Sequence, residues 1–255
     1  MTALWVEITA TRGSAPRDAG TAMKVTAETT EGTIGGGALE LAAIATARRL
    51  LAQGCVSFRQ TLPLGPALGQ CCGGSVSLLF TDAPRPVDPP LSLPAERGAE
   101  PQRAPLDLWI WGAGHVGRAI VASLPPGAAR VTWVDSAPER FPQAIPPRVT
   151  VVPTPAMPLL AARAPREAHH LILTYSHEID LALCTALLRR GFDFCGLIGS
   201  QTKWARFQRR LRSAGLDPSR ITCPIGDKSL GKAPHEIAKG VVAALVSHPE
   251  HEATA

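Results

Sequence analysis

LDLWIWGAGHVG, residues 106–117, is the stretch that decides the fold of the longer part of the chain. An apolar run typical of a β-strand leads into a glycine turn and then into a helical run at 116–124. In this motif the first glycine permits a tight turn, the second lets a diphosphate approach the backbone, and the third lets the helix pack on the strand. Gly112, Gly114 and Gly117 therefore predict a Rossmann-type unit. His115, inside the turn, is a further candidate cofactor-binding residue.

The next strand supports this interpretation. The run 130–134 has the composition of a strand and ends in Asp135, at the spacing where an acidic residue binds a ribose hydroxyl in such folds. A glycine motif alone is weak, but one placed between an apolar strand and a helix favours a Rossmann-type fold. The ligand that this fold would bind stays open.

Strand-like and helix-like runs continue to alternate towards the C-terminus, at 149–152, 170–174, 179–190, 194–198 and 201–214. This order predicts a mostly parallel, doubly wound sheet, with ligands bound at the carboxyl ends of its strands. Three polar residues follow strands at that edge. His177 is either an acid/base or ligand group or a helix cap, and Ser200 is placed to cap the next helix. Lys203 in the first turn opposes the helix dipole unless an anion lies between them.

A Pro-rich segment divides the chain. Residues 82–105 contain seven prolines among charged residues, with almost no apolar periodicity, which predicts an extended, semi-rigid linker. We therefore expect a small N-terminal α+β domain at 1–82, a linker at 83–105 and a Rossmann-like domain at 106–255.

The N-terminal segment contains a candidate anion site. The glycine triplet 35–37 opens a helical run at 38–53, and the free N–H groups of a first helical turn attract anions. Gly36 and Gly37 would supply these groups, and Arg12 and Arg17, which flank a Gly-Pro turn, would add positive charge. The alternative is a flexible helix entry without a ligand.

LGPALGQCCGG, residues 64–74, is the most unusual loop in the chain. Cys71 and Cys72 are adjacent, which is unfavourable for an unstrained disulfide, and they lack the two-residue gap of common zinc sites. Soft thiolates facing a bound metal or a sulfur species fit this pattern better, with Gln70 and Gly73 beside them. The alternative is a tight hairpin turn between strands at 56–62 and 75–80, with both cysteines as small buried side chains.

Composition limits the class of protein. With 255 residues and 45% apolar content, the chain is long and apolar enough for two folded domains. No apolar run approaches the ~20 residues of a membrane span, the start lacks a basic leader, and the six scattered cysteines favour reduced thiols, so we expect a cytoplasmic protein. The net charge is +5, and the basic residues are not interleaved with aromatic residues as in nucleic-acid-binding proteins. This charge suits a small anionic ligand or an acidic partner.

Five of these segments together resemble the XdhC/CoxI family of xanthine dehydrogenase accessory proteins, namely residues 13–17, 34–40, 64–74, 112–116 and 196–200. The resemblance implies a protein without turnover of its own that binds the molybdenum cofactor. It would protect the cofactor while a cysteine desulfurase supplies the terminal sulfido ligand, and then insert it into xanthine dehydrogenase. In this interpretation Cys71 or Cys72 contacts molybdenum, and the glycine loops and arginines hold the phosphate of molybdopterin.

A second hypothesis is an NAD(P)-dependent oxidoreductase. It would bind the dinucleotide at 112–117, with Asp135 on the ribose and His177 as the acid/base. This hypothesis leaves the cysteine loop without a role. A homodimer is a further expectation, through the apolar helix face at 241–245.

Overall fold

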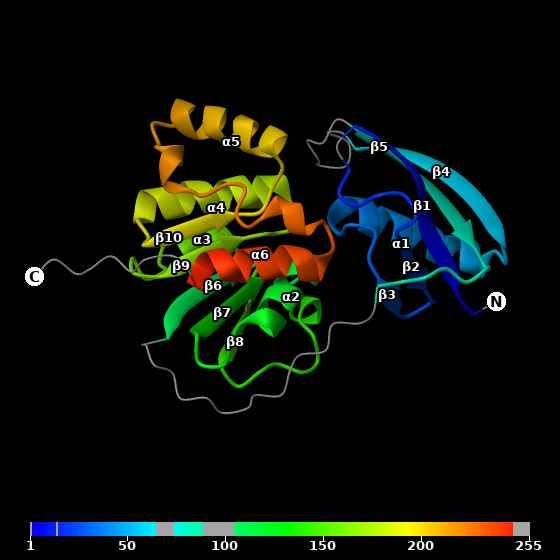
Figure 1. The fold of residues 1–255 in the computed structure, drawn as a ribbon, viewed down its shortest axis with the longest axis horizontal. Helices are drawn as coiled ribbons and strands as arrows, with labels where there is room; N and C mark the ends of the chain where they lie inside the picture. The colour runs from blue at the N-terminus through cyan, green and yellow to red at the C-terminus, as the bar shows by residue number, and fades with distance from the viewer. Residues whose placement is uncertain (1, 14, 65–73, 89–104, 247–255) are drawn as a thin grey trace, which may run out of the picture. The chain divides into compact units, whose positions relative to one another are not determined.

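The computed structural model describes residues 2–13, 15–64, 74–88 and 105–246. The chain forms two compact units, Met1–Leu91 and Ser92–Ala255, each with its own sheet (Figure 1). The boundary between them falls inside the Pro-rich segment, and each unit is described by itself.

The first unit is an antiparallel sheet with one helix. Its strand order is β3-β2-β1-β5-β4, and the unit contains β1 (Leu4–Arg12), β2 (Ala22–Val25), β3 (Thr30–Gly32), α1 (Gly37–Ala52), β4 (Ser57–Leu64) and β5 (Gly74–Thr81). Alternate residues of β1 point into the core, where Val6 and Ile8 pack with Leu39 and Ala43 of α1. The predicted α+β class is therefore confirmed. The three-residue strand β3 was not predicted, because its polar residues carry no strand pattern.

The start of the predicted linker is bound to the first unit. Arg85 donates to Glu7 of β1 with 2.5 Å between Nε and Oε2, and Arg17 donates to Asp88 with 2.8 Å between Nη1 and Oδ2. These ion pairs attach the described residues after β5 to the sheet. That residues 83–105 as a whole form an extended, semi-rigid linker stays a prediction.

The second unit contains a five-stranded sheet in which every described strand pair is parallel. Its strands are β6 (Leu106–Trp111), β7 (Ala129–Asp135), β8 (Val149–Pro153), β9 (His169–Ile172) and β10 (Phe194–Leu197), and its helices are α2 (His115–Ser123), α3 (Met157–Ala161), α4 (His177–Arg190), α5 (Gln201–Ser213) and α6 (Pro234–Val246). The spatial order β10-β9-β6-β7-β8 is the order of a Rossmann sheet, read from its far edge. The predicted Rossmann-type domain is confirmed.

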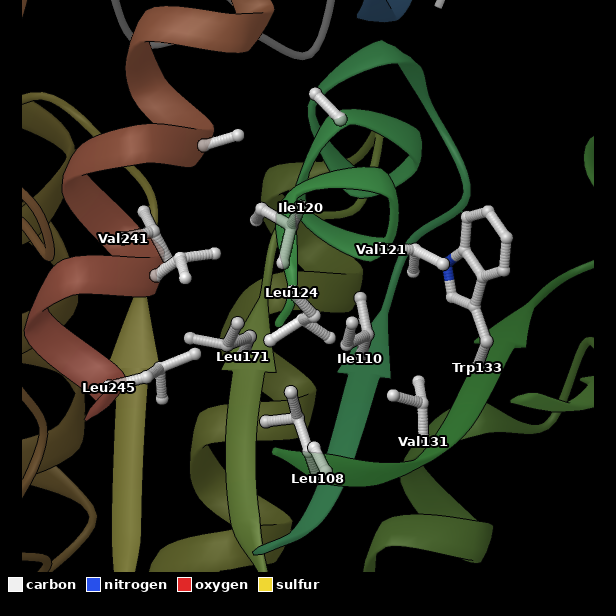
Figure 2. Packing of buried hydrophobic residues seen from close by; sticks show 14 of the residues in the cluster. Leu108, Ile110, Ile120, Val121, Leu124, Val131, Trp133, Leu171, Val241 and Leu245 are labelled. Atoms are coloured by element: carbon white, nitrogen blue, oxygen red, sulfur yellow. The ribbon is translucent and has the colours of Figure 1, made fainter. Parts of the chain in front are cut away.

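Helices cover both faces of this sheet. On one face Ile110, Trp133 and Leu171 form a core with Ile120 of α2 and Val241 of α6 (Figure 2). The opposite face forms a second core with helices α3, α4 and α5, built from Trp111, Ile172, Met157, Leu183, Phe207 and other apolar residues. Because β6 contributes to both cores, it lies in the interior of a doubly wound domain.

The apolar stripe of α6 is used inside its own domain. Val241 and Leu245 face the sheet in Figure 2, and their exposed fractions are 0% and 2%. This face is therefore not available to a partner in the described domain, and a homodimer stays a prediction. Among the helices that the structure describes, none combines the length and hydropathy needed to cross a lipid bilayer.

Candidate functional site

The strand order of the second unit reverses between β6 and β9. In open α/β sheets, ligands bind outside the carboxyl ends of the strands at this point. We call this region the switch-point edge and define it by the loops 112–115 after β6 and 173–177 after β9. The residues 199–203 follow β10 at the same edge, because all of these strands are parallel.

The glycine loop at this edge has the predicted division of roles. Gly112 has a φ of +125°, and a Cβ there would lie 2.4 Å from the Leu173 carbonyl oxygen. A Cβ at Gly117 would lie 2.3 Å from the Gly112 carbonyl oxygen, so the close packing of α2 requires glycine. A Cβ at Gly114 would meet nothing within 4 Å. The tight turn and the helix packing are confirmed, and the space at Gly114 is compatible with the predicted phosphate contact, which stays a prediction.

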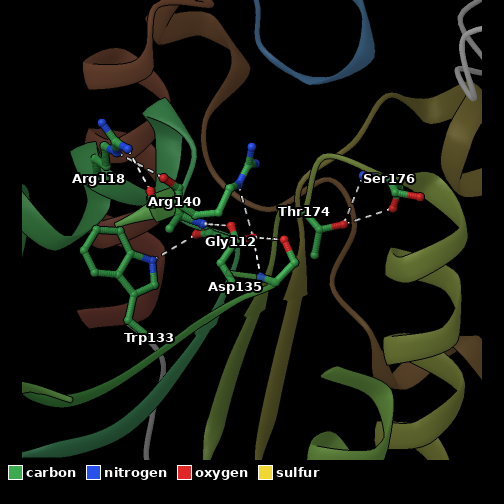
Figure 3. A network of polar contacts seen from close by, with 9 residues as sticks. Gly112, Arg118, Trp133, Asp135, Arg140, Thr174 and Ser176 are labelled. Carbon is green, nitrogen blue, oxygen red and sulfur yellow. Dashed lines mark hydrogen bonds and ion pairs between the residues drawn. The ribbon is translucent and has the colours of Figure 1, made fainter. Parts of the chain in front are cut away.

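Polar side chains fix this loop in place (Figure 3). Trp133 donates from Nε1 to the Gly112 carbonyl oxygen at 3.0 Å, and Arg118 donates from Nε to the Ala113 carbonyl oxygen at 3.1 Å. The Ala113 N–H donates to Asp135 Oδ2 at 2.6 Å. Hydrogen bonds to residues of β7 and α2 therefore fix the glycine loop within its own domain.

Asp135 is buried with an exposed fraction of 1%. Its second oxygen, Oδ1, accepts hydrogen bonds from the Ser136 N–H at 2.6 Å, from the Ser136 hydroxyl at 3.0 Å and from Arg140 Nε at 3.3 Å. Both carboxylate oxygens thus bind donors of the protein itself. The ribose contact stays a prediction, and support of the glycine loop is a role that the sequence did not indicate.

Arg140 links the segment after β7 to the β9–α4 loop of the switch-point edge and to helix α2. Its guanidinium carbon lies 4.9 Å from the ring centroid of Tyr175 in the β9–α4 loop, a cation–π arrangement. Its carbonyl oxygen accepts from Arg118 Nη2 at 2.7 Å. Burial, and then the neighbouring charge of Arg140, lower the pKa of Arg118. Sequence analysis missed both arginines, because neither follows a recognised motif.

A buried ion pair joins the first turns of α4 and α5, the helices that follow β9 and β10. Lys203 Nζ donates to Asp180 Oδ2 at 2.5 Å and to the Ile198 carbonyl oxygen at 3.0 Å, and the exposed fractions of the two residues are 6% and 0%. Asp180 Oδ1 accepts from the N–H and the hydroxyl of Thr174 at 3.0 and 2.7 Å. The anion required beside Lys203 is thus present in the chain as Asp180, which sequence analysis missed. A cofactor contact of Lys203 stays a prediction.

The helix starts at this edge are capped by serine. Ser200 accepts from the Lys203 N–H at 3.2 Å, as predicted, and Ser176 accepts from the Ile179 N–H at 3.5 Å. His177 is therefore not the cap of α4 but its first residue, with its ring 6.4 Å from that of Phe207. Burial and the charge of Lys203 lower the pKa of His177 to about 4. His177 is neutral at pH 7. His115 begins α2 at the same edge, half-buried.

In the first unit a carboxylate of the chain lies at the expected anion site. Glu40 Oε2 accepts from the Thr33 hydroxyl at 2.5 Å, from the Ile34 N–H at 3.0 Å and from the Gly36 N–H at 3.1 Å. Gly36 caps α1 and Gly37 begins it, with φ values of 71° and 64°. The N–H of Gly36 therefore already has an anionic acceptor.

The two arginines of this unit differ. Arg17 is paired with Asp88 and its side chain is 12% exposed, whereas Arg12 is exposed at the end of β1. Whether Arg12, Arg17, Gly36 or Gly37 contacts a cofactor stays a prediction.

The cysteine motif lies outside the described residues, so the structure does not place Gln70, Cys71, Cys72 or Gly73. The flanking strands β4 and β5 pair, with Leu64 opposite Gly74, as the strand pattern predicts. Within 2–13, 15–64, 74–88 and 105–246, no group of three or more His, Cys, Asp or Glu residues is arranged to hold a metal ion.

The parallel sheet and its glycine loop define a Rossmann-type protein with an additional α+β unit. A family model described as the XdhC Rossmann domain matches residues 108–245, and another, described as the XdhC and CoxI family, matches residues 2–60. The chain belongs to the XdhC and CoxI family, which confirms the resemblance found in its motifs.

The chain is similar to a protein of Escherichia coli and to a solved structure from Bacillus halodurans. The uncharacterized protein YqeB of Escherichia coli strain K12 is 25% identical over 254 residues, which cover 94% of this chain and 42% of YqeB. The chain thus spans less than half the length of this curated relative. A crystal structure described as a xanthine dehydrogenase from Bacillus halodurans has 17% identity and a TM-score of 0.47, over 96% of this chain and 91% of that chain.

Proposed function

We propose that this chain is an accessory protein in xanthine dehydrogenase maturation, which binds the molybdenum cofactor, holds it during sulfuration by a cysteine desulfurase and inserts it into xanthine dehydrogenase. The observation that carries the proposal is membership of the XdhC and CoxI family. When bound, the cofactor supplies a molybdenum centre held by the dithiolene of a phosphorylated pterin. The chain itself binds and shields this group.

The described residues fit the anionic part of such a cofactor. Gly114 leaves open space at the start of α2, where free N–H groups favour a phosphate. Arg118 and Arg140 lie beside this loop with Asp135 as the carboxylate between them, which leaves a surplus positive charge. Soft thiolates at Cys71 or Cys72 suit molybdenum. The glycine loop of the second unit is thus suited to a phosphate group.

The rival function is an NAD(P)-dependent oxidoreductase, which the Rossmann strand order favours. Its acid/base would be His177, whose pKa of about 4 is far below the operating pH. General acid/base catalysis is most efficient when the pKa lies near that pH. A pKa so far below neutrality makes His177 a weak candidate for the general acid/base of the rival function.

The test uses the full chain purified from cells that make the molybdenum cofactor. Bound molybdenum is measured by mass spectrometry, and the pterin by its fluorescence after oxidation. We expect both in the wild type and reduced amounts in Cys71→Ala or Cys72→Ala. Cys55→Ala is the matched control, since Cys55 lies two residues before the start of β4, and its thiol donates to the Ser57 carbonyl oxygen.

Transfer is tested by adding the loaded chain to apo xanthine dehydrogenase, with and without a cysteine desulfurase. We expect activation to depend on the loaded chain. Unchanged molybdenum retention in both cysteine variants would contradict the proposed metal contact. Turnover of a substrate with NADH or NADPH, without any bound pterin, would replace the proposal by its rival.

A further inference from the structure

The acidic residue that normally recognises a ribose diol is covered at the switch-point edge. In Rossmann folds an acid at the end of the second strand accepts hydrogen bonds from the ribose, whereas a nearby arginine accommodates a phosphate on that ribose. Here Asp135 has this position, but its exposed fraction is 1% and both of its oxygens accept from protein donors. A diol that reached this place would find no accessible carboxylate.

Arg140 is the group that covers Asp135 and is itself accessible. Its Nε donates to Asp135, while its side chain remains 29% exposed. Among the residues that the structure describes, no hydrogen bond from either Nη of Arg140 is recorded. The guanidinium carbon lies over the Tyr175 ring, 4.9 Å from its centroid, and Nε is bound to Asp135, so two contacts position the guanidinium group. The donors of a planar, oriented guanidinium are therefore available at this edge, and their geometry suits the oxygens of a phosphate.

The surrounding charge favours an anion. Arg118 donates to the Arg140 carbonyl oxygen, and Arg140 donates to Asp135. The charges of Arg140 and Asp135 both act on Arg118, so two cations lie near a single carboxylate. The start of α2 at Gly114 adds the positive end of a helix dipole. A ligand group with negative charge would offset the repulsion between the two guanidinium groups, whereas a neutral diol would not.

We infer that Arg140 makes the switch-point edge a subsite for a phosphate monoester, in place of the ribose diol that an uncovered Asp135 would bind. The inference concerns which chemical group this edge selects, and it does not depend on the proposed function. Two ligands carry such a group: molybdopterin, with its terminal phosphate, and NADP(H), with its 2′-phosphate. The experiment distinguishes them.

NADPH and NADH form a matched pair of probes, because they differ only in the 2′-phosphate. The full chain is titrated with each, and binding is followed by nicotinamide fluorescence; bound molybdopterin is measured in the purified protein in parallel. The variant is Arg140→Gln, which removes the charge. Arg140→Lys retains the charge without the planar fork. The matched control is Arg130→Gln, because Arg130 is exposed at the opposite end of β7.

Charge-assisted hydrogen bonds are worth about 1.5–3 kcal/mol, so we expect Arg140→Gln to weaken binding of a phosphate-bearing ligand roughly 10- to 100-fold. Arg140→Lys should recover part of this loss, and NADH binding should not fall. Loss confined to NADPH identifies the 2′-phosphate as the group bound, and loss confined to molybdopterin identifies the pterin phosphate. Arg130→Gln should change neither.

Three results would overturn the inference: equal affinity for NADPH and NADH together with unchanged molybdopterin retention in Arg140→Gln, an equal loss of NADH binding in that variant, or no binding of either phosphate ligand by the wild type. If molybdopterin retention and NADPH binding both ignore Arg140 while molybdenum is still retained, this inference alone would be removed. A phosphate preference that depends on Arg140, without any retained molybdenum, would instead remove the proposed function alone.

Discussion

Breaking the Asp180–Lys203 ion pair should destabilise the second unit strongly and with a diagnostic pH dependence. In Asp180→Asn the amide oxygen can still accept from Thr174, but Lys203 remains as a buried ammonium without its partner. Removing one partner of a buried pair typically costs about 3–5 kcal/mol, because the other charge stays desolvated. For a slope of about 4 kcal/mol per molar, this moves the guanidinium chloride midpoint by about 1 M.

The assay is equilibrium unfolding of the full chain, followed by tryptophan fluorescence. Four of the five tryptophans, Trp109, Trp111, Trp133 and Trp204, lie in the second unit, so the signal reports mainly on that unit. In Asp180→Asn the loss of unfolding free energy should become smaller as the pH rises, because the unpaired buried lysine becomes neutral when it releases a proton. In Lys203→Met it should shrink as the pH falls, because the stranded carboxylate is relieved by binding one.

The double variant Asp180→Asn/Lys203→Met gives the decisive comparison. Because it contains neither buried charge, it should be more stable than Asp180→Asn alone, with a coupling energy of at least about 1 kcal/mol. Double-variant losses equal to the sum of the single losses would refute the argument, since the two groups would then act independently. Two single variants with the same pH dependence would refute it as well.

Two further predictions concern packing and protonation in the same unit. Gly117→Ala should lower the free energy of unfolding by about 1–3 kcal/mol, because its Cβ would meet the Gly112 carbonyl oxygen. Gly114→Ala should cost less, because its Cβ would meet nothing within 4 Å and only the poorer N-cap preference of alanine opposes it; equal losses in chemical denaturation would contradict this. His170 has a pKa lowered to about 3 by burial and by His169. Because this folded-state pKa is below the unfolded value near 6.5, the unfolded state binds the proton first. Stability should therefore fall as the pH drops from about 6.5 towards 3, by at most ~1.4 kcal/mol per unit from this residue. In His170→Phe the free energy of unfolding should depend less steeply on pH between about 6.5 and 3. An unchanged slope in this range would exclude His170 as the source of the pH dependence.

Much of the fold was predictable because it depends on short-range patterns. The strand at 106–111, the glycine turn and the helix behind it are specified by neighbouring residues, and the alternation of strands and helices then restricts the sheet to parallel order. The cap at Ser200 follows from its place between a strand and a helix. These features needed no knowledge of distant contacts.

The tertiary structure alone decided which charged groups meet. Asp180 and Lys203 are 23 residues apart in the chain and join only because β9 and β10 are neighbours in the sheet. Arg140 reaches Tyr175 only because the loops after β7 and β9 meet at the same edge. Periodicity indicates which face of an element is buried, but the pairing of its polar residues depends on strand order and on the approach of segments distant in the chain. The sequence by itself therefore determined the class of fold and the position of the glycine loop, whereas the sheet topology determined that Asp135 is covered and Arg140 is accessible.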